Sequence, residues 1–316
     1  MRLFRKCKLY VFLLLFYGFL ASIFLLHGQL YTQNDNYEVP DWDERVRKVG
    51  SVCNNTPVLL PSPPQLQQTD LPQPLKKHFL NLFGNDLVLN IARIPALNLD
   101  WCLVPKVAST SLSKLFLPYL PETEEIPAPF IQKEVWQKAG HLTLEQFNSG
   151  QNSRFLISRH PFARISSAYR NKLEDRTRSH DGNYFFNTYS KQIIKLSRGT
   201  VSDDSPEPSF PEFIKFILNS EIYDDDEHWQ PVSLRCRLCQ LEFTHILRYE
   251  ELSTDWEYFK QDVSLPPSLL LPWENKGKLG ALPEYFKQIS REDLEKLGKR
   301  YESDFLMFGY RMEDDF

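Results

Sequence analysis

The 316-residue sequence lacks an excess of positive charge, and this bears on whether the protein binds nucleic acid. It has 37 Lys and Arg residues against 41 Asp and Glu, a formal net charge of −4 at pH 7. This balance argues against bulk binding of nucleic acid and leaves room only for a local basic site. Internal repeats are absent as well. With 42% hydrophobic and 25% charged residues, the composition suits one large globular domain with an appendage.

Paired metal-binding motifs are also lacking. The single C-x-x-C, from Cys236 to Cys239, is half of a zinc site, and no second C-x-x-C or H-x-x-x-H completes it. The nominal D-x-D at residues 224–226 does not follow an apolar strand, as the metal motif of a glycosyltransferase would. The sequence therefore predicts no metal site.

The N-terminus carries a long apolar run behind positive charge. Four basic residues lie within residues 1–8, and residues 9–26 are uncharged and predominantly apolar. That length is near the minimum for a membrane-spanning helix, which needs about 17–25 residues. Because basic residues stay in the cytosol, we predict a cytosolic tail at 1–8, an uncleaved signal anchor at 9–26 and a luminal remainder. A cleaved signal peptide is the alternative, but no clear small-x-small cleavage site follows the run.

Cysteine is scarce, with five residues in the chain. Cys7 lies in the predicted cytosolic tail. The other four lie on the predicted luminal side: Cys53, Cys102, Cys236 and Cys239. An even number in an oxidising compartment favours disulfides over zinc, in a pairing that the sequence leaves open. The single N-x-[ST] sequon makes Asn54 a candidate for glycosylation.

Residues 27–78 are polar and rich in Pro and Gln, as in LLPSPPQLQQTDLPQPLKK, and show no apolar periodicity. We interpret them as a luminal stem that holds a globular domain off the membrane. The domain itself is predicted to occupy residues 79–316.

Within this domain, apolar strand-length runs lead three times into helix-like segments. The pairs are 100–104 with 110–116, 154–159 with 162–174, and 243–249 with 252–263. Alternation of this kind predicts an α/β fold with a central, mostly parallel sheet flanked by helices. A capping box at Ser290 and Asp293 predicts a further helix near the C-terminus.

The loop at residues 105–111 (PKVASTS) has the residues of an anion cradle but no glycine. Where a strand ends and a helix begins, free backbone N–H groups and the helix dipole favour an anion. Lys106 adds a positive charge, and hydroxyl groups follow at Ser109, Thr110 and Ser111. An ordinary strand–helix turn with a Ser or Thr cap explains the loop equally well. A nucleotide triphosphatase would need glycines and a magnesium site, so the loop suits a phosphate-like group without a metal clamp.

A second segment, RHPFARISSAYRNK, offers a complementary grip. Arg159 ends a predicted strand, Pro161 opens a helix at a position that favours proline, and Ser167 lies about two turns into that helix. The forked donors of arginine match the oxygens of a phosphate group. We therefore predict that Arg159 and Ser167 hold a second phosphate.

These segments resemble the motifs of sulfotransferases that bind PAPS (3′-phosphoadenosine 5′-phosphosulfate). VPKVASTS is similar to the loop for the 5′-phosphosulfate, and RHPFARISSAYRNK to the 3′-phosphate motif R-[DE]-P-F-x-R-[LIV]-x-S-A-[YF]-R-x-K. DDEHWQPVSLRCRLC resembles the HWxP…CxxC segment of Golgi carbohydrate sulfotransferases, in the branch that modifies GalNAc 4-hydroxyls of chondroitin or dermatan, or terminal glucuronate. The likeness covers residues 101–310. His160 stands where the family usually has an acid, and TSLSKLF (110–116) replaces a more usual T-N-W-K-R.

The resemblance implies a P-loop-like sulfotransferase fold and sulfuryl transfer from PAPS to a sugar hydroxyl, with no metal. It implies that Lys106 stabilises the charge that develops on the leaving group. Arg159 and Ser167 would bind the 3′-phosphate. The 5′-phosphosulfate of PAPS would be bound by the loop residues Pro105, Lys106, Val107, Ala108, Ser109, Thr110 and Ser111.

A general base should take the proton of the acceptor hydroxyl. His141, in AGHLTLEQF, and His228, in EHWQP, are the two candidates. GHLTLEQF is similar to the stretch that bears the base in uronyl 2-O-sulfotransferases. Either histidine could instead be structural, and Glu250 is a third candidate.

The expected acceptor is a glycan, with a glycosaminoglycan of the chondroitin or dermatan type as the leading expectation. The resemblance implies a Golgi membrane protein of type II, glycosylated on its luminal side. The alternatives are another glycan hydroxyl (on uronic acid, an N-glycan or a glycolipid), a type II Golgi glycosyltransferase, and a glycan-binding protein without catalysis. The sequence does not specify the oligomeric state.

Two charged segments are ambiguous. Basic residues in and after the second segment form either a strip for an anionic glycan or a solvated helix face: Arg164, Arg170, Lys172, Arg176 and Arg178. The acidic run at 224–227 is interpreted as a solvated loop.

Overall fold

The computed structural model describes residues 39–55, 90–120, 131–139, 142–272 and 282–313. The chain divides after Pro40, and Asp41–Phe316 forms one compact unit. The predicted tail and signal anchor lie outside the described residues. Of the helices in the described ranges, none is long and apolar enough to cross a membrane.

A four-stranded mixed sheet lies at the centre of the compact unit, in the order β1-β2-β3-β4. β2 (Leu99–Cys102), β3 (Ser153–Ser158) and β4 (His245–Arg248) are parallel, and β1 (Ile91–Ile94) adds an antiparallel edge. The parallel strands coincide with the three predicted apolar runs, because strands covered on both faces are apolar throughout.

The predicted strand–helix units are present. α4 (Ser109–Phe116) follows β2, α7 (Pro161–Lys172) follows β3, and α12 (Leu252–Asp262) follows β4. The predicted α/β class, with helices around a central sheet, is therefore confirmed. Strand β1 is an addition that none of the predicted apolar runs covers.

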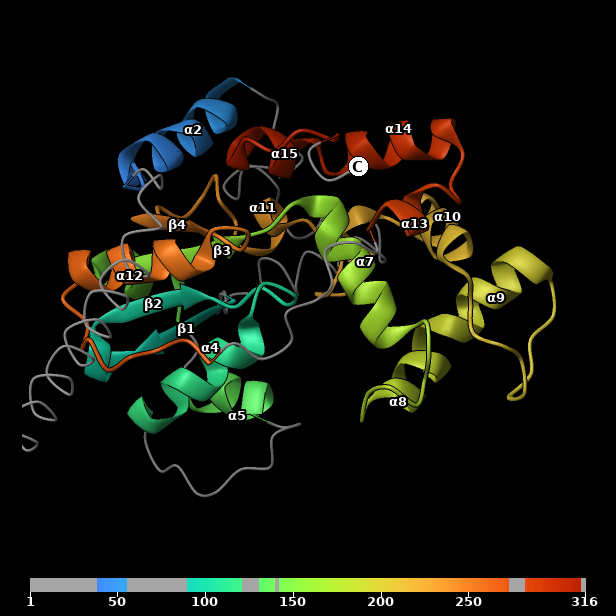
Figure 1. The fold of residues 1–316 in the computed structure, drawn as a ribbon, viewed down its shortest axis with the longest axis horizontal. Helices are drawn as coiled ribbons and strands as arrows, with labels where there is room; N and C mark the ends of the chain where they lie inside the picture. The colour runs from blue at the N-terminus through green and yellow to red at the C-terminus, as the bar shows by residue number, and fades with distance from the viewer. Residues whose placement is uncertain (1–38, 56–89, 121–130, 140–141, 273–281, 314–316) are drawn as a thin grey trace, which may run out of the picture. The chain divides into compact units, whose positions relative to one another are not determined.

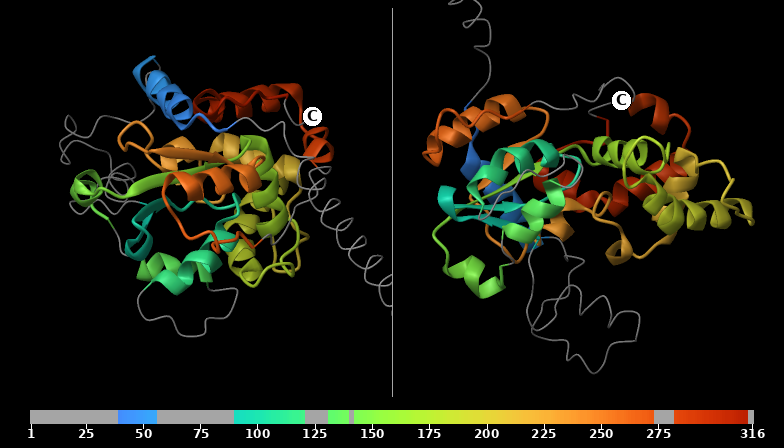
Figure 2. Two further views of the ribbon diagram at one scale, coloured as in Figure 1. Left: turned by 60° about the vertical axis from the view of Figure 1, so that its left-hand side comes forward. Right: turned by 90° about the horizontal axis from the view of Figure 1, so that it is seen from below.

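The remaining described helices are α2 (Trp42–Asn55), η2 (Pro95–Leu97), η3 (Leu117–Tyr119), α5 (Ile131–Lys138), α6 (Leu144–Ser149), α8 (Gly182–Phe185), η5 (Phe186–Ser190), α9 (Lys191–Arg198), α10 (Phe210–Asn219), η6 (Ile222–Asp224), α11 (Val232–Arg235), α13 (Leu282–Phe286), α14 (Arg291–Arg300) and α15 (Glu302–Phe308). Of these, α8, α9, α10, α13 and α14 gather on the side of α7 away from the sheet, and α2, α5, α11 and α15 lie nearer the sheet (Figures 1 and 2). The capping residue Ser290 begins α14 as predicted, its hydroxyl accepting from the amide of Asp293.

Two apolar clusters form the core. The first surrounds the sheet and includes Trp101, Phe155 and Trp256. The second surrounds α7 and α10 and includes Phe162 and Phe213. Because α7 starts at the end of β3 and packs in the second cluster, it connects the sheet to the helical part, as Figure 1 shows.

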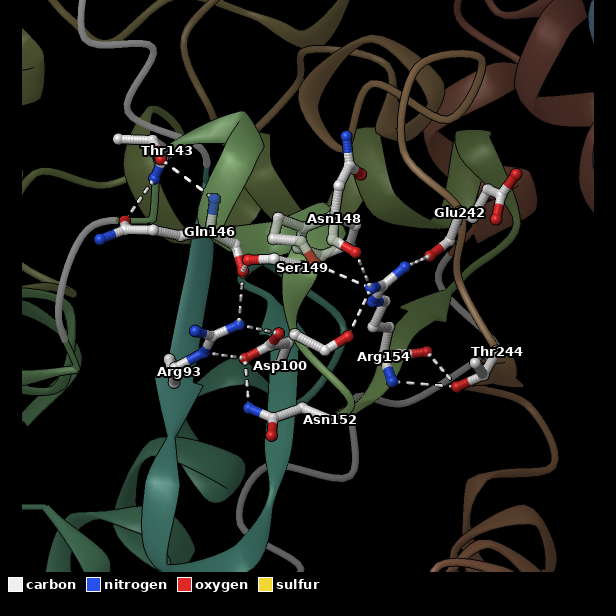
Figure 3. Close-up of polar contacts among 12 residues, drawn as sticks. Arg93, Asp100, Thr143, Gln146, Asn148, Ser149, Asn152, Arg154, Glu242 and Thr244 are labelled. Atoms are coloured by element: carbon white, nitrogen blue, oxygen red, sulfur yellow. Dashed lines mark hydrogen bonds and ion pairs between the residues drawn. The ribbon is translucent and has the colours of Figure 1, made fainter.

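A polar network fixes the amino ends of the strands (Figure 3). Arg93 of β1 makes two hydrogen bonds, of 2.8 and 2.7 Å, to the fully buried carboxylate of Asp100 in β2. Arg154 of β3 donates to the carbonyls of Phe147 and Gly150 at 2.7 and 2.9 Å. A paired carboxylate of this kind is strongly held, since burial without a partner is costly. The strands are thus aligned from the end opposite to the loops at 105–111 and 159–161.

Helix α2 corrects the predicted stem. Residues 42–55 are helical and pack against β4 and α15, so the prediction of a stem across 27–78 is wrong for this segment. Arg45 donates to Asp255 at 2.6 Å, to Glu251 at 2.9 Å and to the carbonyl of Ile246 at 2.9 Å. Only Val49 of α2 is buried, which explains why the sequence shows no broad apolar stripe. Residues 27–38 and 56–78 of the predicted stem lie outside the described residues.

Two disulfides link distant parts of the compact unit. Cys53 of α2 pairs with Cys239, and Cys102 of β2 pairs with Cys236. The two cysteines of the C-x-x-C therefore bind different partners. In the part of the chain that the structure describes, no group of three or more His, Cys, Asp or Glu is placed to hold a metal ion.

The pairing of α2 with the domain predicts a difference between two arginines of that helix. Arg45→Ala should lower the free energy of unfolding by about 3 kcal/mol, because it leaves the buried carboxylate of Asp255 without its charged partner. Arg47→Ala is the matched control, since the exposed Arg47 side chain donates, within the described residues, to the carbonyl of Asp43 in its own helix. Denaturant unfolding would measure both, and equal losses would contradict the role of α2 as part of the domain.

Candidate functional site

A cavity of about 260 Å³ lies where β2 and β3 end and α4 and α7 begin. Its lining includes most of the residues predicted from the two segments and one predicted base: Pro105, Lys106, Ala108, Ser109, Thr110, Ser111, Arg159, Ser167 and His228. Val107 does not line it, because its side chain is buried in the cluster around the sheet. His141 lies outside the described residues. Among the described lining residues there is no carboxylate, so the cavity suits an anion.

The loop replaces glycine with two left-handed residues. Lys106 has φ 73° and Ala108 has φ 67°, in a region that costs a residue with a Cβ atom about 1–2 kcal/mol. Ala108 is also the N-cap of α4, and no side chain caps that helix. The alternative of an ordinary turn with a Ser or Thr cap is therefore not what the chain adopts. The hydroxyls of the loop are available for another purpose.

Lys106 is held by contacts to its backbone and to its side chain. Arg159 Nη1 donates to the carbonyl of Lys106 at 2.8 Å. The Lys106 ammonium donates to Asn171 Oδ1, which lies in the last turn of α7. Burial, together with the positive charges of Lys172 and Arg159, lowers the pKa of Lys106 to about 7, although Asp181 opposes the shift. The ammonium is thus close to neutralisation near neutral pH.

The cations of the second segment are fixed by aromatic rings and one acid. The guanidinium of Arg159 lies over the ring of Tyr249, 4.2 Å from its centre. Lys172 is buried, forms an ion pair with Asp181, and lies over the ring of Phe185. Cation–π contacts of this kind orient a charge without neutralising it. Lys172 therefore belongs to the cavity, and the reading of it as part of an exposed basic strip is wrong.

His228 is oriented by an acid. Its Nδ1 lies 2.6 Å from Asp226 Oδ1, and Tyr189 donates to the other oxygen of Asp226 at 3.0 Å. When the Nδ1–H of a neutral histidine donates a hydrogen bond to a carboxylate, Nε2 is left unprotonated and can accept a proton. Burial lowers the pKa of His228, and the hydrogen bond and charge of Asp226 oppose that shift.

The loop that carries His228 is held by buried ions. The guanidinium of Arg164 is fully buried and donates to the carbonyls of His228 and Gln230. Asp225 forms a 2.9 Å ion pair with Arg300, and burial raises its pKa to about 7. The interpretation of residues 224–227 as a solvated loop is therefore wrong for Asp225 and for the half-buried Asp226, whereas Asp224 and Glu227 are exposed. The placement of Arg164 on an exposed strip is also wrong.

Glu250 has a structural position. One carboxylate oxygen accepts from the amide of His160 at 2.9 Å, and the other accepts from the hydroxyl of Tyr310 at 2.7 Å. Glu250 thus accepts a hydrogen bond from a backbone amide at the amino end of α7. It is not among the residues that line the cavity. The His160 ring is buried among Phe162, Phe305 and Tyr310, so the histidine that replaces the family's acid serves packing.

The cavity also contains residues that sequence reasoning missed. They are Gln132, Asn171, Ser179, His180 and Tyr249. Asn171 lies inside the second segment, one residue before its final lysine, and that spacing on α7 was the one signal that could have found it. Tyr249 ends the predicted strand run 243–249, where a residue at the carboxyl end of a strand could have been expected near the site. Gln132, Ser179 and His180 come from segments without a motif, so their place in the cavity arises only from the tertiary fold.

The family follows from this geometry and from comparison with known proteins. The profile of the sulfotransferase family matches residues 90–311. The chain therefore belongs to the sulfotransferase family, which confirms the resemblance drawn from its motifs. The family implies PAPS as the sulfuryl donor, and the cluster of Lys106, Arg159 and Lys172 with loop hydroxyls fits its phosphates.

Within the family, the chain is similar to carbohydrate sulfotransferases. Carbohydrate sulfotransferase 11 of Mus musculus is 29% identical over 234 residues, covering 67% of this chain and 64% of the relative. Carbohydrate sulfotransferase 12 of Xenopus laevis is 27% identical over 255 residues, covering 68% and 58%. The chain thus spans less than two thirds of the length of these relatives. No solved structure matches it.

The pKa of Lys106 predicts how pH controls binding of PAP, the nucleotide left after transfer. Between pH 7 and 9 the phosphates stay ionised while Lys106 loses its proton, so the affinity should fall by up to about tenfold per pH unit. The lowered pKa of His228 keeps that group neutral across this range. Calorimetry would measure the slope. A Lys106→Arg variant, charged throughout, should show no slope, and an unchanged slope there would assign the titration to another group.

Proposed function

We propose that the protein transfers a sulfuryl group from PAPS to a hydroxyl of a glycan. The observation that carries this proposal is the cavity itself: a pocket without described carboxylates, at the carboxyl ends of β2 and β3, where Lys106, Arg159 and Ser167 converge. The names of the relatives support a carbohydrate acceptor. Membership of the family favours this activity over a glycosyltransferase or a silent glycan-binding protein.

In the proposed reaction the acceptor oxygen bonds to sulfur as the bond from sulfur to the bridging phosphate oxygen breaks. Lys106 stabilises the negative charge that develops on that bridging oxygen. The loop residues Ser109, Thr110 and Ser111 hold the 5′ side of the donor. Arg159 and Ser167 hold the 3′-phosphate, which distinguishes PAPS from ordinary nucleotides.

We propose His228 as the general base. It lines the cavity, and Asp226 orients its ring so that Nε2 can take the proton of the acceptor hydroxyl. Tyr189 fixes Asp226 in turn. His141 remains a second candidate on the ground of its sequence alone.

For the acceptor, we propose the 4-hydroxyl of GalNAc in chondroitin or dermatan. The likeness of residues 225–239 to the HWxP…CxxC segment supports this choice, and other glycan hydroxyls are the outcomes that would replace it. A Golgi membrane location of type II topology is proposed from the basic and apolar N-terminus. The two disulfides suit an oxidising lumen, and Asn54, exposed on the last turn of α2, is proposed as the glycosylated residue.

Transfer of radiolabelled sulfate from PAPS tests the proposed function. The full-length chain should label chondroitin or dermatan in a panel that also contains heparan sulfate, N-glycans and glycolipids. Labelling of another member would replace the proposed acceptor and keep the activity. No labelling of any member, together with no binding of PAP, would refute the proposed function.

The histidine assignment predicts a separation of turnover from donor binding. His228→Ala should lower kcat by about 10²–10⁴-fold, because it removes the proton acceptor. Affinity for PAP should change less than about threefold, since the base faces the acceptor. Asp226→Asn should give a smaller loss of kcat by releasing the ring. If His141→Ala lowers kcat at saturating PAPS and His228→Ala does not, the base is His141.

A further inference from the structure

Gln132 lies against the first turn of α4 without belonging to either motif. It is the second residue of α5, which packs beside α4. Its side-chain nitrogen Nε2 lies 2.9 Å from Ser109 Oγ and 2.7 Å from Thr110 Oγ1. Gln132 also lines the cavity together with both hydroxyls. One amide group therefore touches the two hydroxyls that open the helix.

The chemistry of an amide nitrogen fixes the role of each hydroxyl. The NH₂ group has two protons and accepts nothing, so each hydroxyl accepts one of these hydrogen bonds. A hydroxyl has a single proton, which then has to point elsewhere. In the described part of the chain neither hydroxyl caps α4, and Ala108 occupies the cap position. Ser109 and Thr110 both line the cavity, so their hydroxyl protons can donate to an anion bound there.

The opposite amide orientation would make the site unsuitable for an anion. If Oε1 faced the hydroxyls, both would donate to it and would present lone pairs to the cavity. Those lone pairs would repel the anion that Lys106 and Arg159 attract. With Nε2 facing the hydroxyls, the hydroxyl groups therefore attract an anion, as the positively charged lining residues do.

We propose that Gln132 is a positioning residue that makes Ser109 and Thr110 hydrogen-bond donors for the 5′-phosphate of the sulfuryl donor. This inference rests on the proposed function, because it assumes that the loop at 105–111 holds the 5′ side of PAPS. It adds a specificity element from α5, outside the segments that carry the family motifs.

Two ligands separate this role from a general effect on folding. PAP carries both phosphates, whereas adenosine 3′-monophosphate lacks the 5′-phosphate and should not sense the loop hydroxyls. In the full-length chain, Gln132→Glu should weaken PAP binding by at least about tenfold, because a carboxylate takes both hydroxyl protons and adds negative charge. Gln132→Leu, which removes the donors without adding charge, should weaken it about three- to tenfold. Both variants should bind adenosine 3′-monophosphate as the unaltered chain does.

Gln137→Glu is the matched control, since it makes the same change at an exposed position of the same helix. It should leave both affinities unchanged, and calorimetry would measure all four proteins. Unchanged PAP binding in the Gln132 variants, or equal losses for the two ligands, would overturn the role of Gln132 while leaving the proposed function intact. Failure of the unaltered chain to bind PAP would overturn the proposed function and this inference with it.

Discussion

The candidate site depends on one hydrogen bond, from Arg159 to the backbone carbonyl of Lys106. These residues follow neighbouring parallel strands, β3 and β2, so the bond joins the two segments that the sequence separates by more than fifty positions. It holds a residue whose left-handed backbone is unfavourable on its own. The stacking of Arg159 on Tyr249 fixes the donor in turn. Arg159 therefore sets the position of Lys106 by binding its backbone carbonyl.

The absence of glycine from the loop has a physical consequence. Glycine adopts the left-handed conformation without steric cost, but it loses more conformational entropy than other residues when the chain folds. Lys106 and Ala108 adopt this conformation at a steric cost instead, and contacts such as the hydrogen bond from Arg159 to Lys106 hold the loop in place. The loop is thus kept in shape by its neighbours, chiefly α7 and α5, rather than by its own conformational preference. Asn171 and Gln132 contact this loop from the two helices, although neither residue lies in it.

The sequence predicts the parallel strands, their helices and most of the cavity lining, because those features follow from apolar runs and local motifs. It does not predict α2, whose attachment comes from Arg45, Asp255 and a disulfide between residues far apart in the chain. It also misplaces Arg164 and Asp225, because charged residues lie at the surface unless a partner is present. Their partners come from distant segments, and no local pattern records them. Gln132 has no motif for the same reason.

The two sides of the cavity rest on different parts of the core. Lys106 and Ser109 follow β2 and are supported by the cluster around the sheet, whereas His228 is in a loop held by Arg164, Arg300 and the second cluster. Helix α7 belongs to both sides: it starts at β3 and lines the cavity with Ser167, Asn171 and Lys172, while its apolar residues pack in the second cluster. Reactions between bound groups are sensitive to displacements of about 1 Å. The separation between the proposed phosphate-binding residues and the proposed base is therefore set by how α7 packs. The ion pair of Lys172 with Asp181 and the aromatic contacts of α7 would then contribute to the geometry of the proposed reaction as well as to stability.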